Sequence, residues 1–285
     1  MKPLRLNSVI KEKRLQRTLG RFSSVRRLHG LVATLHQIAS NDQDHLDPKG
    51  QASSVFGGLD VEKMAHQIRT DGLALGLRLP EPLRLGMAQF GTSAPVKPWG
   101  AKEPLPLEAV MGGRLPTGEP VAVAESAGID GCPEAAKVVR DPKILLLAKR
   151  VLGYNPRNID VSLRWSFPTH LSLTEHCNVD LASRWHYDVI GKNSMSLFFY
   201  ILKGDSDLDG AHATILKSHR KKKISMLFRP STTISEAELI SYYGPGQVVI
   251  ATGEPGDGFA EDPNTFHRAM QPISSPRLVL LVRYT

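Results

Sequence analysis

The stretch Arg184-Trp185-His186-Tyr187-Asp188, together with His267 far downstream, decides how this chain is interpreted. Side chains two residues apart on a β-strand point to the same face, so a strand here aims His186 and Asp188 at one point. A second histidine from a distant strand completes a set of two histidines and one carboxylate. Such a set leaves positions on the metal open and is typical of Fe(II) oxygen chemistry. The sequence therefore predicts a metal site formed by His186, Asp188 and His267.

A second His-x-Asp pattern, His45-Leu46-Asp47, shows that the spacing alone is not specific. It lies in a polar run and is followed at once by Pro48, which indicates a loop with no strand to orient the two side chains. The copy at residues 186–188 instead lies next to the strand-like run 194–202. We therefore place the predicted metal site at the downstream copy.

The composition of the 285 residues is that of a soluble globular protein with one large domain or two small ones. Cys132 and Cys177 have no CxxC or histidine-rich neighbourhood, so we interpret them as reduced thiols of a reducing compartment. No apolar run reaches the length of about 18 residues that a transmembrane helix needs. The N-terminus also lacks the apolar region of a secretory signal. We expect a cytoplasmic protein without a membrane span.

The net charge of +8 is concentrated in residues 1–30, which hold nine basic residues and one acidic residue. The rest of the chain is therefore neutral overall. A nucleic-acid-binding enzyme is expected to line its cleft with positive charge, whereas this body has one local cluster, residues 220–223. We interpret that cluster as a solvated charged turn, with contact to an anionic substrate as the alternative. The sequence predicts a small-molecule substrate and no nucleic-acid partner.

Residues 6–38 carry apolar residues at helical spacing, with basic residues between them. This pattern predicts one or two amphipathic helices, broken or kinked near Gly20 and Gly30. We interpret residues 1–55 as a basic helical extension packed on a domain of residues 56–285, with a solvated basic face. Mitochondrial targeting and binding to an anionic surface are the alternatives for this Arg-rich segment.

Helix signals dominate the first half of the chain and strand signals the second. Helices are predicted at 59–70, at 143–152 behind the N-cap Asp141 and Pro142, and at 236–243 behind the capping box of Ser235. Strands are predicted at 73–79, 159–167, 170–174, 179–188, 194–202, 211–216, 247–252 and 278–284. We expect an α+β chain with a mainly β core, a double-stranded β-helix (jelly roll) with flanking N-terminal helices.

Two segments rich in turn residues are predicted to be irregular. Residues 91–120 are rich in proline and glycine, and such long excursions are usually functional covers. Residues 253–263 are acidic and precede His267, so we expect a mobile loop over the site.

The order of several residues resembles a known family. His186-Tyr187-Asp188, then Asp209-Gly210-Ala211 leading to Ser218-His219, then His267 and Arg277, resemble the phytanoyl-CoA dioxygenase-like branch of the Fe(II)/2-oxoglutarate oxygenases. The resemblance covers roughly residues 60–285. It implies a double-stranded β-helix with Fe(II), 2-oxoglutarate and O2 as cofactors. Two positions depart from the family pattern: Leu216-Lys217 stands where Pro-Gly is common, and Ala269 stands where a hydroxyl side chain is common.

The resemblance also implies roles for residues outside the set of His186, Asp188 and His267, called the metal set below. Arg277, ten residues after the distal histidine, is expected to pair with the far carboxylate of 2-oxoglutarate, which its guanidinium matches bidentately. Arg283, on the same strand face, is the reserve candidate. Phe199 falls where the family often places an aromatic beside the cosubstrate, with an ordinary core position as the alternative. His212 is a candidate substrate contact.

The resemblance implies a dioxygenase that hydroxylates or otherwise oxidises a small organic molecule, such as a secondary metabolite or an acyl group, and releases succinate and CO2. Asp188 argues against halogenation, whereas desaturation, epoxidation and cyclisation stay open. Two rivals also stay open. A jelly-roll metalloenzyme that does not use 2-oxoglutarate predicts that Arg277 is dispensable. A β-rich binding module with a degenerate site predicts no metal dependence.

Overall fold

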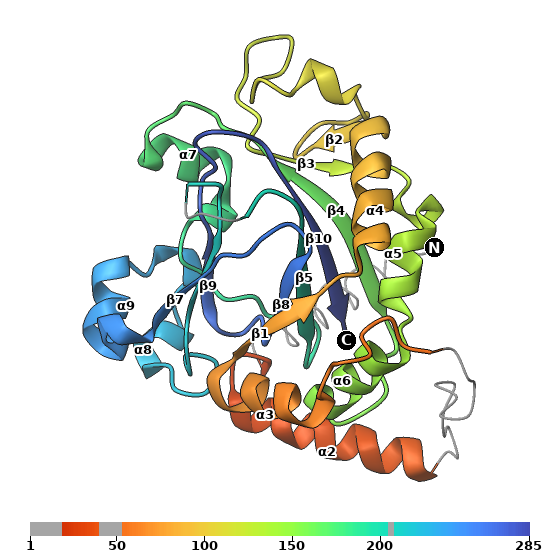
Figure 1. Cartoon of the computed structure of the whole chain (residues 1–285). Coiled ribbons are helices and arrows are strands. Elements are labelled where there is room, and N and C mark those ends of the chain that lie inside the picture. The colour runs from red at the N-terminus through yellow and green to blue at the C-terminus, as the bar shows by residue number, and fades with distance from the viewer. Residues whose placement is uncertain (1–18, 40–52, 205–207) are drawn as a thin grey trace, which may run out of the picture.

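The computed structural model describes residues 19–39, 53–204 and 208–285, and its strands form two antiparallel sheets (Figure 1). The larger has the order β1-β8-β5-β10-β4-β3-β2 and the smaller the order β7-β6-β9. The larger sheet comprises β1 (Leu73–Arg78), β2 (Val96–Pro98), β3 (Val123–Ser126), β4 (Ile159–Ser166), β5 (Met195–Leu202), β8 (Asp257–Glu261) and β10 (Arg277–Tyr284). The smaller comprises β6 (His212–Ile215), β7 (Val248–Ala251) and β9 (Phe266–Ala269). The two sheets form the predicted double-stranded β-helix.

Helices cover the outer faces of both sheets (Figure 1). The described α-helices are α2 (Ser23–Ala39), α3 (Val61–Asp71), α4 (Glu81–Ser93), α5 (Pro133–Val139), α6 (Pro142–Leu152), α7 (Leu173–Val179), α8 (Ile224–Leu227) and α9 (Glu236–Tyr243). The main hydrophobic core lies between α3–α6 and the larger sheet. A smaller core lies behind the three-stranded sheet against α8 and α9.

Strand alternation divides the larger sheet into a helix-packed face and an inner face. On β10, Leu278, Leu280, Val282 and Tyr284 belong to the main core. The residues between them, Arg277, Val279, Leu281 and Arg283, instead line a pocket between the sheets. Charged side chains are thereby placed on the inner face without breaking the helix-packed core.

Most of the predicted elements are confirmed. α3, α6 and α9 match the three predicted helices, and Asp141 caps α6 by accepting from the backbone N–H groups of Lys143 (2.9 Å) and Ile144 (3.3 Å). The strands β1, β4, β5, β6, β7 and β10 also lie where predicted. The segment 91–120, which was predicted to be irregular, contains the short strand β2. The helices α4 and α5 were not predicted.

Two strand predictions and one loop prediction are wrong. Residues 170–174 and most of 179–188 are not strands, because Ser172 and Glu175 form a capping box that begins α7 and Asp180 caps the following 3-10 turn. Residues 257–261 form β8 instead of a mobile loop. β8 pairs with both β1 and β5 and is therefore an interior strand, whose first and last residues are the acidic Asp257 and Glu261.

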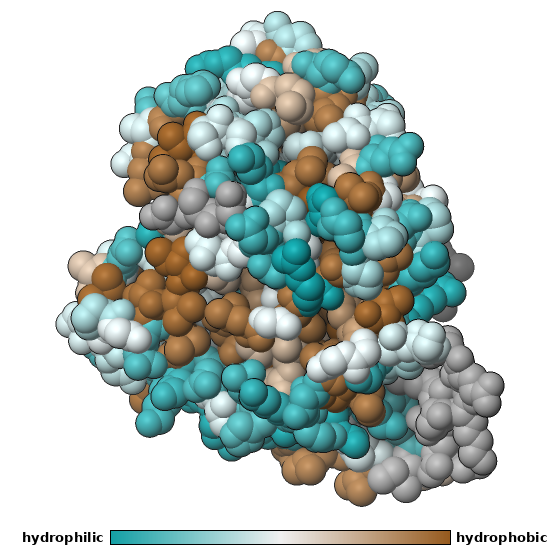
Figure 2. Space-filling view, in the orientation of Figure 1, coloured by the Kyte–Doolittle hydropathy of each residue, from teal (hydrophilic) through white to brown (hydrophobic). Residues whose placement is uncertain are grey.

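Helix α2 is attached to the body by polar contacts. Arg26 donates to both carboxylate oxygens of Asp262 (3.0 and 2.7 Å) and to the carbonyl of His219 (3.1 Å). The apolar residues Leu28, Leu31, Val32 and Leu35 are exposed, and Figure 2 shows hydrophobic residues at the lower edge, where α2 lies. The exposed face of α2 is therefore largely apolar, unlike the basic face expected for the N-terminal segment, whose basic residues before Leu19 lie outside the described residues.

Residues 1–18 and 40–52 lie outside the described residues. The second His-x-Asp pattern, at His45 and Asp47, falls there, and the division of the chain at residue 55 stays a prediction. None of the helices in the described ranges is long and apolar enough to cross a membrane.

Gly258 offers a test of how tightly β8 packs. A Cβ there would lie 2.3 Å from Phe199 Cδ1 and 2.4 Å from the backbone oxygen of Phe198. We expect Gly258→Ala to lower the free energy of unfolding by about 1–3 kcal/mol, because a backbone atom cannot move aside cheaply. Gly246→Ala is the matched control, since no atom lies within 4 Å of its Cβ. Equal denaturant midpoints for the two variants would contradict this packing.

Candidate metal centre and its pocket

The structure brings His186, Asp188 and His267 together. One candidate ligand atom from each lies within 4.8 Å of the others, and no other such group is found among the described residues. His186 and His267 exchange backbone hydrogen bonds of 3.0 and 2.7 Å, and the Asp188 N–H donates to the carbonyl of Pro263 (2.8 Å). The segment is an isolated bridge instead of a regular strand, yet it still aims residues 186 and 188 to one side.

Both histidines are oriented in the same way by their own backbone. Nδ1 of His186 lies 2.8 Å from the carbonyl oxygen of Arg184, and Nδ1 of His267 lies 3.0 Å from that of Thr265. A carbonyl can only accept, so each Nδ1 carries the hydrogen and each Nε2 keeps its lone pair. This is the second-sphere arrangement that presents histidine to a metal ion, so the residues present fit one.

The electrostatics favour the ligand forms of two of these side chains. Burial, together with the nearby His186, lowers the pKa of His267 to about 4, so its imidazole is neutral at neutral pH. Burial opposes ionisation of Asp188, but His267, His186 and Arg283 outweigh it and hold the pKa of Asp188 below its ordinary value. A neutral imidazole and an ionised carboxylate are the forms that bind metal.

Arg277 lies in the same pocket, as predicted. Its side chain is buried, and Nη2 donates to Ser166 Oγ (3.0 Å). Its Nε has no hydrogen-bond partner, and burial lowers the pKa of Arg277. The nearby Asp180 already accepts from the Ala182 N–H (3.0 Å) and the Ser183 hydroxyl (2.9 Å). A buried guanidinium with unused donors fits an incoming carboxylate.

His212 also lines the pocket, but its polar edge is engaged. Nε2 lies 2.9 Å from Glu261 Oε2, and the ring stacks on His267 with centroids 5.2 Å apart. Burial and the charge of Arg277 lower the pKa of His212 to about 3. Burial raises the pKa of Glu261 to about 7. His212 therefore presents a ring face, and Glu261 is a buried polar partner that the sequence-based loop prediction concealed.

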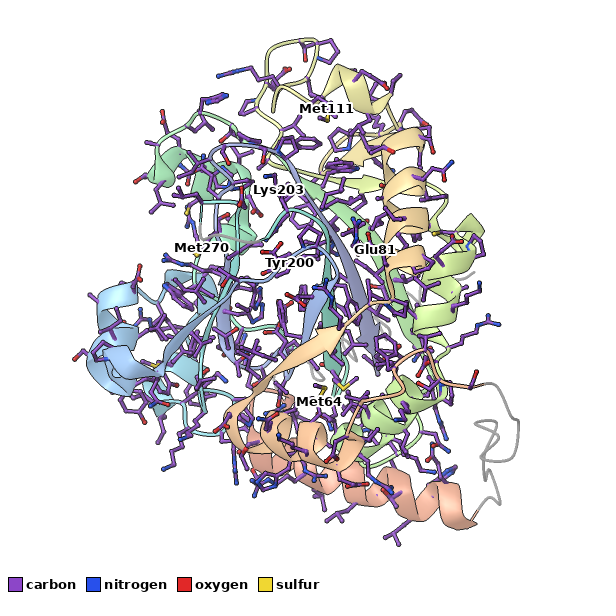
Figure 3. All side chains as sticks on the ribbon, in the orientation of Figure 1. Met64, Glu81, Met111, Tyr200, Lys203 and Met270 are labelled. Carbon is purple, nitrogen blue, oxygen red and sulfur yellow. The ribbon has the colours of Figure 1, made fainter. Side chains whose placement is uncertain are left out.

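Phe199 is placed differently from the prediction. Its ring lies in the main core, stacked on Phe56 with centroids 5.8 Å apart. The neighbours Phe198 and Tyr200 line the pocket instead, and Figure 3 shows Tyr200 near the centre of the molecule. Because side chains alternate along a strand, an error of one position moves a residue to the opposite face. The aromatic expected beside the cosubstrate is therefore not Phe199.

A scaffold behind the metal set was also missed. Asn264 Nδ2 donates to the backbone oxygen of Asp188 (3.1 Å). The ammonium of Lys222 donates to the carbonyls of Ser218 (2.9 Å) and Asn264 and lies 4.4 Å from the ring centroid of Tyr187. Burial, aided by Arg26, holds the pKa of Lys222 well below its ordinary value. Lys222 is thus an internal support, which corrects its interpretation as part of a solvated turn.

A wider outer cavity of about 590 Å³ adjoins the metal set. Its lining includes Arg21, Trp99, Arg164 and Arg283 together with His186 and Asp188. This volume lies in the range of ligand-binding pockets. Trp99 and Arg164 lie far apart in the sequence and carry no motif, so only their packing reveals them as neighbours.

The metal set makes a direct prediction for binding. The full chain is expected to bind one Fe(II) under anaerobic conditions, measured by titration calorimetry. His186→Ala should weaken this binding by more than the ~10–100-fold seen for loss of an outer-sphere partner, because it removes a ligand. His66→Ala removes an exposed histidine of α3 and is the control. Equal affinities for the two variants would exclude His186 as a ligand.

Comparisons with known proteins support the fold. No protein-family model and no curated protein matches the chain. The non-heme alpha ketoglutarate dependent epimerase SnoN from nogalamycin biosynthesis is 15% identical with a TM-score of 0.52, covering 79% of this chain and 82% of that one. A second SnoN structure, in complex with Fe3+, alpha ketoglutarate and nogalamycin RO, also has a TM-score of 0.52 at 15% identity, covering 79% and 83%.

EvdO2 from Micromonospora carbonacea var. aurantiaca is a further structural neighbour. It is 14% identical with a TM-score of 0.52, and the match covers 81% of this chain and 92% of that one. Identities this low establish the fold and no more. The chain therefore shares its double-stranded β-helix fold with the alpha ketoglutarate dependent epimerase SnoN and with EvdO2.

Proposed function

We propose that this protein is an Fe(II)/2-oxoglutarate-dependent oxygenase that oxidises a small organic molecule. One observation carries the proposal: the set of His186, Asp188 and His267 shares a pocket with Arg277, a buried guanidinium with an unused Nε donor. Bound Fe(II), with 2-oxoglutarate and O2, supplies an oxidant for unactivated C–H bonds, with succinate and CO2 as co-products. The shared fold with alpha ketoglutarate-dependent enzymes supports this assignment.

The residues of this chain have distinct tasks in the proposal. His186 and His267 offer their Nε2 lone pairs and Asp188 its carboxylate, which leaves the other positions on the metal open. Arg277, oriented by Ser166, holds the far carboxylate of 2-oxoglutarate. The apolar side chains of Phe198, Phe259, Val279 and Leu281 line the space and restrict water there.

The buried guanidinium also separates the proposal from its first rival. A buried charge without a full set of partners is destabilising, so Arg277 needs a reason to be there. A metalloenzyme that does not use 2-oxoglutarate gives Arg277 no such role. The order of motifs favours the phytanoyl-CoA dioxygenase-like branch. SnoN is described as an epimerase, so the shared fold supports reactions other than hydroxylation. Substrate placement decides among hydroxylation, desaturation, epoxidation and cyclisation.

The test is an anaerobic absorption titration of the full chain with Fe(II) and then 2-oxoglutarate. We expect a weak visible charge-transfer band that needs both components and is absent in His186→Ala. Arg277→Gln should weaken 2-oxoglutarate binding roughly 10–100-fold, because charge-assisted hydrogen bonds are lost. Arg277→Lys should give an intermediate affinity, since lysine keeps the charge and loses the bidentate geometry.

The control variant is Arg78→Gln, which removes an exposed guanidinium paired with Asp257 outside the pocket. It should leave the band unchanged. Iron binding without a band would favour a metalloenzyme that does not use 2-oxoglutarate. Absence of iron binding would leave a β-rich binding protein.

A further inference from the structure

β10 carries two arginines on its inner face, and each lies in a different environment. Arg277 begins the strand and Arg283 lies six residues further on, which corresponds to a separation of roughly 20 Å along the backbone. Arg277 contacts Ser166, whereas Nη2 of Arg283 lies 3.7 Å from Asp188 Oδ2. The proposed cosubstrate takes up Arg277. Arg283 therefore stands beside the metal set at the other end of the row, with no task in that function.

Arg283 is only loosely paired. Within residues 19–39, 53–204 and 208–285, its closest carboxylate contacts are Asp188 at 3.7 Å and the exposed Asp160, whose Oδ2 lies 3.9 Å from Nη1. Both distances exceed those of a charge-assisted hydrogen bond. Its Nε is buried and has no hydrogen-bond partner.

Two further arginines line the same outer cavity. Arg164 projects from β4, where its Nε donates to Glu125 (2.9 Å) and its guanidinium lies 5.4 Å from the ring centroid of Trp99. Arg21 precedes α2 and donates from Nη1 to the carbonyl of Leu227 (2.7 Å), while its buried Nε has no partner. Three guanidiniums from distant parts of the chain thus surround one cavity.

The charge of this cavity is unbalanced towards the positive. Asp188 is the only carboxylate in its lining among the described residues, and it belongs to the metal set. Glu125 and Asp160 lie outside that lining and each contacts one arginine. Burial and repulsion from Arg283 lower the pKa of Arg164 in spite of its ion pair with Glu125, which is consistent with two guanidiniums lying near each other.

We propose that the outer cavity binds an anionic substrate, a ring-containing organic molecule whose carboxylate or phosphate is held by Arg283, Arg164 and Arg21. This inference rests on the proposed function, because it names the substrate class of that site. Guanidiniums match carboxylate and phosphate bidentately through their N–H groups, which is why three of them around one cavity suit an oxyanion. Trp99, which lines the same cavity and is 47% exposed, offers a flat apolar surface for the ring.

The test measures binding of three probes to the full chain by titration calorimetry, with Fe(II) and saturating 2-oxoglutarate under anaerobic conditions. The probes are phenyl phosphate, benzoate and the neutral benzyl alcohol. We expect at least one anion to bind tenfold or more tightly than benzyl alcohol, with an affinity that falls as salt rises. The order of phenyl phosphate and benzoate then distinguishes a phosphate from a carboxylate substrate.

Arg283→Gln and Arg164→Gln should each weaken anion binding at least tenfold, and Arg78→Gln should leave it unchanged. If either pocket variant fails to fold, the unmodified chain still tests the proposal, because its anion affinity is expected to fall as salt rises. Equal binding of anions and benzyl alcohol, no binding of any probe, or anion binding unaffected in both pocket variants would overturn the proposal. Loss of anion binding only in Arg277→Gln would place the anion at the cosubstrate end and also overturn it.

Failure of the proposed function is seen separately. It appears as the absence of the absorption band that requires Fe(II) and 2-oxoglutarate. The anion test is repeated without Fe(II), and it depends on differences among probes and variants instead of turnover. An anion preference that needs Arg283 and Arg164 but occurs without the band would retain the anion site and reject the oxygenase function.

Discussion

The reciprocal backbone hydrogen bonds between His186 and His267 are the constraint on which the rest of the site depends. They hold two distant segments of the chain side by side without a regular strand at residue 186. Each imidazole then donates to the carbonyl two residues before it, so both rings are oriented by the backbone. Asp188 is held in turn through Pro263 and Asn264. A metal ion would meet ligands whose geometry does not depend on its presence.

The pocket contains more buried ionisable side chains than stability alone would favour. Arg277 is buried with one side-chain partner, and Glu261 and His212 face each other between the sheets. A buried charge lacking its partners costs several kcal/mol, so such groups are retained where they serve a ligand. The helix-packed face of β10 is uniformly apolar and supplies the packing that offsets this cost. Because side chains alternate along a strand, β10 carries the charged groups of the pocket on one face and the apolar packing on the other.

The metal set and Arg277 could be predicted because their signals are local or ordered along the chain. His186 and Asp188 are two residues apart, and Arg277 follows His267 at a fixed spacing. Phe199 was assigned to the wrong face of β5 because successive side chains of a strand point to opposite faces of the sheet. The pairing of β5 with its neighbours sets which of these faces lines the pocket. The helix α7 was missed because its composition is typical of a strand. Its capping box outweighs that composition in the folded chain. β8 was missed because its acidic residues suggested a loop, although one of them, Glu261, is buried.

The sequence by itself indicated the candidate ligand types, from residue chemistry, and a β-rich second half, from its strand-like runs. The resemblance to a known family added the expectation of a double-stranded β-helix and of Arg277 in the pocket. Only the tertiary structure decided which side chains surround the ligands. Trp99, Arg164 and Arg21 converge with Arg283 on one cavity although they come from separate elements. Lys222 supports the metal set from within, although its neighbours in sequence indicated solvent. These contacts join residues far apart in the chain, and no local pattern encodes long-range packing.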